Sequence, residues 1–170
     1  MKFSELAAAR YSVRSFKPDP VPKEILDRIL EAGRLAPTAH NNQPIKIFAV
    51  QSKEGLEKIK KSTECHYNAP LVFVVCYDKN ECWTRSYDGK TSGDIDASIV
   101  TTHMMLEAAD LGIGSTWVMY FIPEAVRREF DLPENLEPSA LMVMGYPSDD
   151  AAPSPRHEVR KPIEELVELC

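Results

Sequence analysis

A buried central helix is predicted by DIDASIVTTHMMLEAADL, residues 94–111. Apolar side chains, among them Ile95, Ile99 and Met105, occur on more than one face of this helix. A helix that is apolar nearly all round belongs in the interior of a domain. Gly112 follows directly, and glycine commonly ends helices because it adopts the left-handed conformation without strain.

Strands and helices alternate from residue 46 onward. Four short runs rich in apolar residues are predicted to be strands: 46–51, 71–77, 115–120 and 140–146. Helices are predicted at 25–35, which ends near Pro37, at 123–130 and at 162–169, with Ser52 as the N-cap of a further short helix. A central sheet covered by helices buries both kinds of element. Residues 148–160 are extended and polar, and we expect them to wrap over a neighbour.

Residues 1–170 are expected to form a single domain, because this length buries a sizeable core without a second one. The pI near 5.3 argues against a nucleic-acid-binding protein, which presents an extended basic face. The longest apolar run, Leu71 to Tyr77, is too short to cross a bilayer, and Met1 to Glu5 lack the apolar core of a secretory signal. The four cysteines show no disulfide spacing. We therefore expect a cytoplasmic protein with neither membrane nor nucleic-acid partners.

Two short basic segments occur in a chain whose formal net charge is -6: Arg10 to Phe16, and Arg156 to Lys161. Alternate residues of an extended segment project to one face, so Arg10, Ser12 and Arg14 are predicted to lie side by side. Guanidinium forks and a hydroxyl suit phosphate oxygens. A solvated basic patch explains either segment alone equally well, but together they predict an anion between them.

Glycine-based phosphate sites are excluded by the sequence. The one GxG, Gly112-Ile113-Gly114, follows a predicted helix rather than a strand, and Trp117 stands where the dinucleotide fingerprint has its third glycine. There is no Walker A motif and there are only 7 glycines. Histidines and cysteines lack zinc-site spacing, so no metal is predicted, and no GxSxG motif provides a hydrolase nucleophile. A phosphate would have to be held by arginine and hydroxyl side chains.

The loop from Ala36 to Pro44 is a second candidate site. Its amide side chains, including Asn41 and Gln43, offer donors and acceptors that suit a flat heterocycle. Asparagine and proline are also favoured in turns, so an ordinary turn is the alternative.

Five motifs follow one another along nearly the whole chain: Arg10-x-Ser12-x-Arg14-x-Phe16, Ala36-Pro37-Thr38 with Asn41-x-Gln43-Pro44, Asn68-Ala69-Pro70, Leu111-Gly112-Ile113-Gly114-Ser115-x-Trp117, and Arg160-Lys161-Pro162. Each is weak alone, but the combination resembles the nitroreductase family of FMN-dependent oxidoreductases. The chain departs from the family pattern at Tyr11, where a basic residue is common, and at Ile45, where many members have tryptophan. It is also short for the family, which leaves the substrate less defined than the cofactor.

The resemblance implies an α+β fold with a central mixed β-sheet flanked by helices, and an intertwined homodimer that holds FMN in two interface pockets. The residues that it implies for FMN fall into four groups: Arg10, Ser12 and Arg14 at the phosphate, ribityl and pyrimidine parts; Arg160 or Lys161 at the phosphate; Thr38 and Asn41, with Pro37 nearby and Gln43 in the same loop, from the partner subunit; and the backbone around Trp117, Met119 and Tyr120 at the isoalloxazine.

The implied activity is reduction of a nitroaromatic, a quinone or a related acceptor by NADH or NADPH, in ping-pong order. No catalytic side chain is expected, because the flavin carries the redox chemistry. Two alternatives remain open. One is a protein that stores, senses or degrades FMN without NAD(P)H turnover, and the other is an interaction domain with surface basic clusters. Neither the acceptor nor the preferred nicotinamide follows from the residues.

Overall fold

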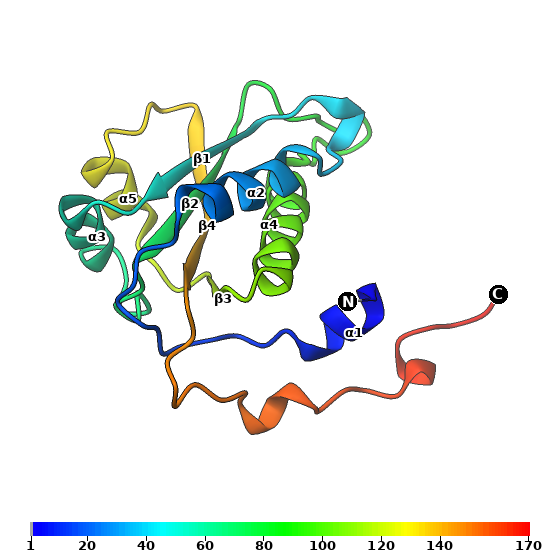
Figure 1. The fold of residues 1–170 in the computed structure, drawn as a ribbon. Helices are drawn as coiled ribbons and strands as arrows, with labels where there is room; N and C mark the ends of the chain where they lie inside the picture. The colour runs from blue at the N-terminus through cyan, green and yellow to red at the C-terminus, as the bar shows by residue number, and fades with distance from the viewer. Residues whose placement is uncertain (1) are drawn as a thin grey trace.

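A four-stranded sheet lies at the centre of the computed structural model, which describes residues 2–170 (Figure 1). Its strands, in spatial order, are β1 (Ile45–Val50), β2 (Leu71–Asp78), β4 (Leu136–Gly145) and β3 (Gly114–Val118). All three pairings are antiparallel, so the expectation of a mixed sheet is wrong for these strands. Alternating strands and helices favour parallel neighbours, and β2 and β3 do run in the same direction. However, β4 lies between them and runs opposite to both.

Both faces of the sheet are covered by helices. On one face lie α2 (Lys23–Arg34) and the predicted central helix, α4 (Gly93–Asp110), and on the other lie α3 (Lys53–Lys60) and α5 (Pro123–Glu129). Leu71, Phe73 and Val75 of β2 face the first pair, and Val72 and Val74 face the second. A strand buried on both faces is a continuous apolar run, which explains why β2 was predictable from sequence.

Local signals set several boundaries. The Ser52 hydroxyl accepts a hydrogen bond from the Gly55 amide at 3.0 Å, which confirms the predicted N-cap. Gly112 has φ +76° and follows the last residue of α4 by two positions, as expected for a helix end. None of the helices in residues 2–170 combines the length and the hydropathy that crossing a bilayer requires.

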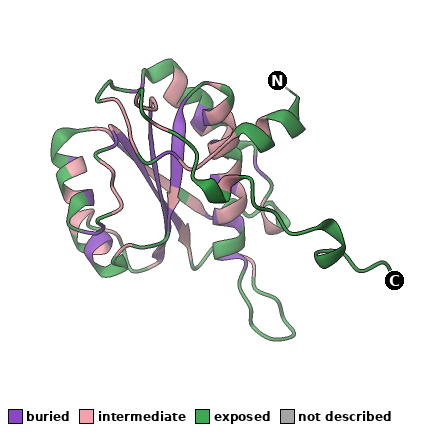
Figure 2. Ribbon diagram, turned by 90° about the horizontal axis from the view of Figure 1, so that it is seen from below, coloured by how far each residue is buried: buried purple, intermediate pink, exposed green. Residues whose placement is uncertain are grey.

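The two ends of the chain run side by side. After α1 (Phe3–Ala9), the Val13 amide donates to the Ser115 carbonyl of β3 at 3.0 Å, and Ser12 forms an isolated parallel bridge with Ser115. The Ser148 amide in turn donates to the Ser15 carbonyl at 3.1 Å. Beyond these contacts the C-terminal segment extends away from the body and is almost wholly exposed (Figure 2). Whether it covers a neighbour stays a prediction.

The helix predicted at 162–169 is wrong. Only a 3₁₀ turn, Ile163–Glu165, forms there. The apolar side chains that indicated a helix, including Leu166 and Leu169, are exposed. A short helix gains most of its stability by packing an apolar face, and residues 2–170 leave this face exposed.

Candidate functional site

The two basic segments meet in one pocket. Arg10, Ser12 and Arg14 line it from the N-terminal side, and Arg156 and Arg160 line it from the C-terminal side. Its volume is about 360 Å³. The structure therefore brings together the first three predicted residues and one of the two C-terminal candidates, and we call this site the arginine pocket. Lys161 is not among its lining residues and pairs with Glu165 at 3.7 Å.

The N-terminal wall of the arginine pocket is fixed by β3. Val13 is 2% exposed, and its carbonyl accepts a hydrogen bond from the buried Thr116 hydroxyl. Because alternate residues of an extended segment face opposite sides, burial of Val13 turns Ser12 and Arg14 the other way. The Ser115 hydroxyl, buried next to this segment, has no hydrogen-bond partner among residues 2–170.

The C-terminal wall is held by contacts with the N-terminal segment. The Tyr11 hydroxyl donates to the Ala151 carbonyl at 3.4 Å, and the Tyr11 and His157 rings meet edge to face with centroids 6.2 Å apart. The Ser154 hydroxyl accepts from the Arg156 amide at 3.3 Å, which caps the 3₁₀ turn Pro155–His157. Arg156 is thereby presented on a capped turn rather than on a free strand.

The arginines of the pocket have no carboxylate partner among the residues that the structure describes. Each of the five other arginines pairs with a carboxylate: Arg28, Arg34, Arg85, Arg127 and Arg128. Among residues 2–170, no ion pair involves the four arginines of the pocket. Like charges gathered without counter-charges repel one another, so this set is suited to an anion supplied from outside.

The second candidate site, the loop from Ala36 to Pro44, does not contribute to the arginine pocket. Residues 37–43 precede β1, far from the terminal segments that form the arginine pocket (Figure 1). Thr38 and Gln43 instead line a separate pocket of about 220 Å³ beside Val100 of α4. The Thr38 hydroxyl accepts from the Gln43 amide at 3.0 Å. Neither Pro37 nor Asn41 lines the arginine pocket. That this loop serves the site of a partner subunit stays a prediction.

The residues implied for the isoalloxazine lie at the end of β3. Trp117 packs against the core between the sheet and helices α2 and α4. Met119 and Tyr120 follow the strand and are 66% and 77% exposed. The Tyr120 carbonyl accepts from the Thr63 hydroxyl at 2.5 Å, which ties the end of β3 to the segment before β2. None of the three lines the arginine pocket.

Sequence reasoning left out residues that the structure places at the site. Tyr11, Ser154, Arg156 and His157 also line the arginine pocket. Arg156 and His157 belong to the C-terminal basic segment, so the charge pattern was the signal for them, whereas Tyr11 and Ser154 carry no charge signal.

Tyr67 is a further neighbour of the site. Burial raises the pKa of its hydroxyl, Cys65 adds to the rise, and Arg14 opposes it, which places Arg14 beside this phenol. Tyr67 and Asn68 both have positive φ, 48° and 50°, and such non-glycine strain is concentrated at functional sites. The Asn68-Ala69-Pro70 motif, directly after Tyr67, is the sequence signal that could have pointed to Tyr67.

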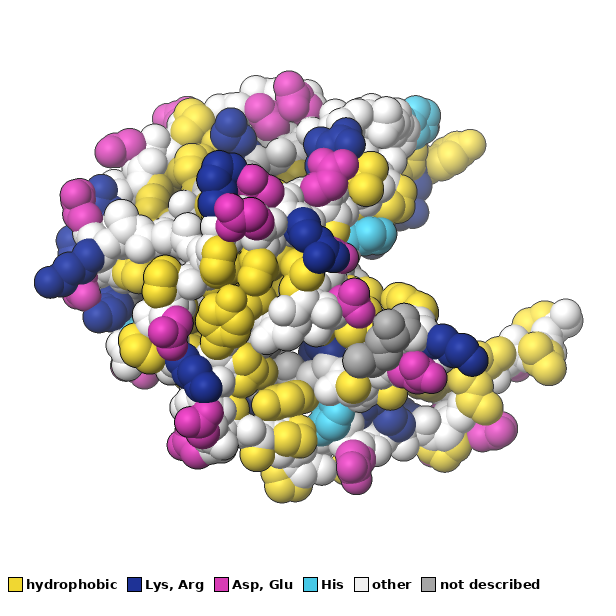
Figure 3. Space-filling view, in the orientation of Figure 1, with side chains coloured by type: hydrophobic (Ala, Val, Ile, Leu, Met, Phe, Trp, Pro, Cys, Tyr) yellow, Lys and Arg dark blue, Asp and Glu magenta, His cyan; other side chains and the backbone are white. Residues whose placement is uncertain are grey.

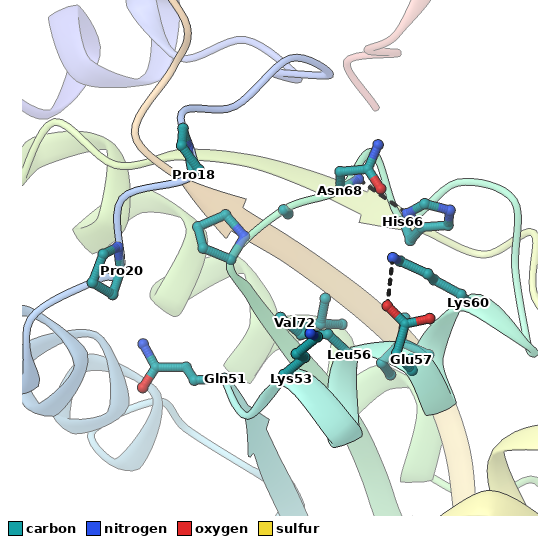
Figure 4. Close-up of a pocket in the computed structure, with 13 residues that line it drawn as sticks. Pro18, Pro20, Gln51, Lys53, Leu56, Glu57, Lys60, His66, Asn68 and Val72 are labelled. Carbon is teal, nitrogen blue, oxygen red and sulfur yellow. Dashed lines mark hydrogen bonds and ion pairs between the residues drawn. The ribbon is translucent and has the colours of Figure 1, made fainter.

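Another pocket, of about 300 Å³, lies between α3 and the start of β2 (Figure 4). Lys60 points toward Glu57 and pairs with it at 2.7 Å. His66 lies nearby, and its Nδ1 accepts from the Asn68 amide at 3.0 Å. Because one of its cations is already paired, this pocket is a weaker anion site than the arginine pocket.

Comparison with known proteins identifies the family. The sequence model described as Nitroreductase family matches residues 7–68 and 64–146. A nitroreductase family protein of Clostridium difficile 630, known from a crystal structure, is 47% identical, with a TM-score of 0.94 over 99% of this chain and 98% of that one. The FMN reductase [NAD(P)H] of Bacillus subtilis is 28% identical over 85% of this chain and 66% of its own length. The NADH dehydrogenase of Thermus thermophilus is 27% identical over 95% of this chain and 92% of its own length. The five motifs thus predicted the family correctly, and the chain belongs to the nitroreductase family.

Proposed function

We propose that this protein is an FMN-dependent oxidoreductase that uses NADH or NADPH to reduce a nitroaromatic, a quinone or a related acceptor. The observation that carries the proposal is the arginine pocket, in which four guanidiniums lie without a carboxylate partner among residues 2–170. Membership of the nitroreductase family supports it, and one relative is named an FMN reductase.

The arginine pocket fits the phosphate group of FMN. A phosphate dianion supplies the missing counter-charge, and its oxygens match the donor forks of Arg10, Arg156 and Arg160. The Ser12 hydroxyl adds a short directional donor. Arg160 is the better C-terminal candidate, because Lys161 already pairs with Glu165.

Bound FMN would supply hydride transfer from NAD(P)H and onward transfer of two electrons to the acceptor, in ping-pong order. The protein itself would bind and orient the flavin and would stabilise the charge that the flavin gains on reduction. Arg14 lies beside Tyr67, and its cation at the pyrimidine side of the flavin would stabilise the negative charge of the reduced form. No acid or base side chain is assigned to the reaction.

The remaining contacts are proposed to come from a homodimer. The loop 37–43 lies far from the arginine pocket of its own chain (Figure 1), so Pro37, Thr38, Asn41 and Gln43 would serve the flavin of the partner subunit. Backbone groups around Trp117, Met119 and Tyr120 are proposed to face the isoalloxazine. Each site would then contain residues of both subunits.

An absorbance spectrum of the purified protein, followed by anaerobic addition of NADH or NADPH, tests this function. We expect flavin bands, after reconstitution with FMN where needed, and their bleaching on addition of the nicotinamide. Flavin bands that do not bleach would favour storage, sensing or degradation of FMN instead. A protein that stays colourless after reconstitution would refute the proposal.

A further inference from the structure

A buried carboxylate links helix α4 to the loop 37–43. Asp96 is 1% exposed and lies in the first turn of α4. One of its oxygens, Oδ1, accepts from the Ala39 amide at 2.9 Å, and the other, Oδ2, accepts from the Ser92 hydroxyl at 2.7 Å. A buried carboxylate is tolerated when hydrogen bonds of this kind satisfy it, and the N-terminal end of a helix also favours a negative charge. Asp96 is therefore a stably buried carboxylate that can anchor the loop it contacts.

The loop that Asp96 holds has a costly backbone conformation. Its residues His40, Asn41 and Gln43 have φ of 53°, 56° and 52°. Each such non-glycine residue costs of the order of 1 kcal/mol or more and persists only where the surroundings enforce it. Ala39 is the first residue of the 3₁₀ turn Ala39–Asn41, so its amide has no partner within the turn, and Asp96 supplies one.

Two further contacts hold the same loop. The Asn42 side-chain amide donates to the Glu81 carbonyl at 2.9 Å, and the His40 ring stacks on Trp83 with centroids 5.5 Å apart. Both partners belong to the loop between β2 and α4, which is largely exposed. Asp96 is the anchor that belongs to the rigid core.

We infer that Asp96 is a positioning residue for the flavin site. It would set the conformation of residues 38–41 and thereby the place of Thr38 and Asn41 at the FMN of the partner subunit. This role rests on the proposed function, because it assumes that the loop contacts FMN. Asp96 itself would not touch the cofactor.

The chain offers a control on the same turn of α4, the more exposed Asp94. Asp94 Oδ1 accepts from the Ser139 hydroxyl of β4 at 2.7 Å, so this carboxylate bonds the sheet rather than the loop. Asp94→Ala removes a hydrogen bond of similar length near the same helix end. Asp96→Asn is the conservative variant, because its carbonyl can still accept from Ala39 while its amide donates to Ser92.

The test is a titration of apoprotein with FMN, for the wild type and these variants. Flavin fluorescence monitors the binding. For Asp96→Ala we expect the Kd of FMN to rise about tenfold or more, since a hydrogen bond to a charged group is lost. Asp96→Asn should give a smaller rise, and Asp94→Ala should stay within about twofold of wild type. Hydrogen exchange of the Ala39 amide, measured without FMN, should accelerate in Asp96→Ala and not in Asp94→Ala.

Other results would overturn the inference. An FMN Kd for Asp96→Ala that matches wild type excludes a positioning role, and so does unchanged exchange at Ala39. An equal rise in Kd for Asp94→Ala means that general destabilisation is responsible. If Asp96→Ala does not fold, Asp96→Asn decides by the same two measurements. A wild-type protein that does not bind FMN refutes the proposed function itself, and the flavin role of Asp96 with it, which distinguishes that failure from the others.

Discussion

Arg160 and Lys161 are adjacent cations in different surroundings. Arg160 lines the arginine pocket, and its guanidinium donates only to the Val159 carbonyl, at 2.9 Å, among the hydrogen bonds of residues 2–170. Lys161 is 72% exposed and pairs with Glu165. From the sequence alone the two were equivalent. The side-chain directions that separate them depend on how the extended segment turns, which no local pattern encodes.

Replacement of each residue by alanine separates their roles. Arg160→Ala should weaken FMN binding by about 1.5–3 kcal/mol, roughly tenfold to a hundredfold in Kd, because it removes a charge-assisted hydrogen bond to phosphate. Lys161→Ala is the matched control and should change the Kd by no more than about twofold. Titration of apoprotein with FMN measures both. Equal losses for the two variants would show that only overall positive charge matters.

His66 makes stability depend on pH. Burial lowers the pKa of its imidazole below the usual 6.5, and Lys60 adds to the effect while Glu57 opposes it. The unfolded chain therefore binds a proton more readily than the folded one, and stability falls as pH drops through and below about 6.5. We expect the urea midpoint of the apoprotein to decrease between about pH 7.5 and 5.5.

His66→Asn provides the comparison for this pH effect, because asparagine keeps an acceptor for the Asn68 amide. Its urea midpoint should decline less over the same pH range than that of wild type. Parallel pH profiles for the two proteins would assign the decline to other titrating groups, such as carboxylates.

At the scale of elements, the contact of residues 12–14 with β3 depends on Gly114. A Cβ at this position would lie 2.7 Å from Val13 Cγ2 and 2.9 Å from Val13 Cβ. Gly114→Ala should therefore push the N-terminal wall of the arginine pocket away from β3. Overpacking of this kind costs about 1–3 kcal/mol of stability, and we expect FMN affinity to fall as well.

Gly112→Ala is the control for Gly114→Ala. Gly112 has φ +76°, and among residues 2–170 no atom beyond its neighbours in the chain lies within 4 Å of the position that an alanine methyl group would take, so alanine there strains only the local backbone. It should lower stability by about 1 kcal/mol and leave FMN affinity unchanged. Thermal unfolding and FMN titration of both variants check this, and a normal affinity for Gly114→Ala would contradict the role given to the contact.

The sequence predicted elements whose signals are local. Continuous apolar runs marked β2 and α4, and Ser52 marked the start of α3. Prediction from the sequence failed where contacts between residues far apart in the chain determine the structure. Strand β4 begins at Leu136, four residues before the predicted start, because the register shifts opposite Val75 and Cys76 and accommodates Pro138 within the strand. Strand order likewise depends on packing of the whole sheet, so the antiparallel arrangement had no local signal.

At the scale of the molecule, apolar surface remains uncovered in the single chain. Hydrophobic side chains are visible in the hollow between the main body and the terminal segments (Figure 3). The C-terminal segment carries a series of exposed apolar residues: Val159, Ile163, Leu166, Val167 and Leu169. Ile95 of α4 is also exposed, beside an open pocket of about 440 Å³. Surface of this kind favours association with a second copy.

We expect size-exclusion chromatography with light scattering to give a mass near twice 19.1 kDa. A double variant, Ile163→Asp with Leu166→Asp, should weaken the dimer, because charges replace apolar side chains that a partner would cover. The same variant should lose FMN affinity if each site needs both subunits. A stable monomer that retains FMN would contradict the shared site.

The arginine pocket is built from residues 10–14 and 154–160 of a chain of 170 residues. All four strands of the sheet, from β1 to β4, lie between these two walls in the sequence. A chain that stops after β4 contains every strand of the sheet but only half of the pocket. A cut between β4 and the second wall would therefore leave the sheet whole and remove the C-terminal half of the anion site.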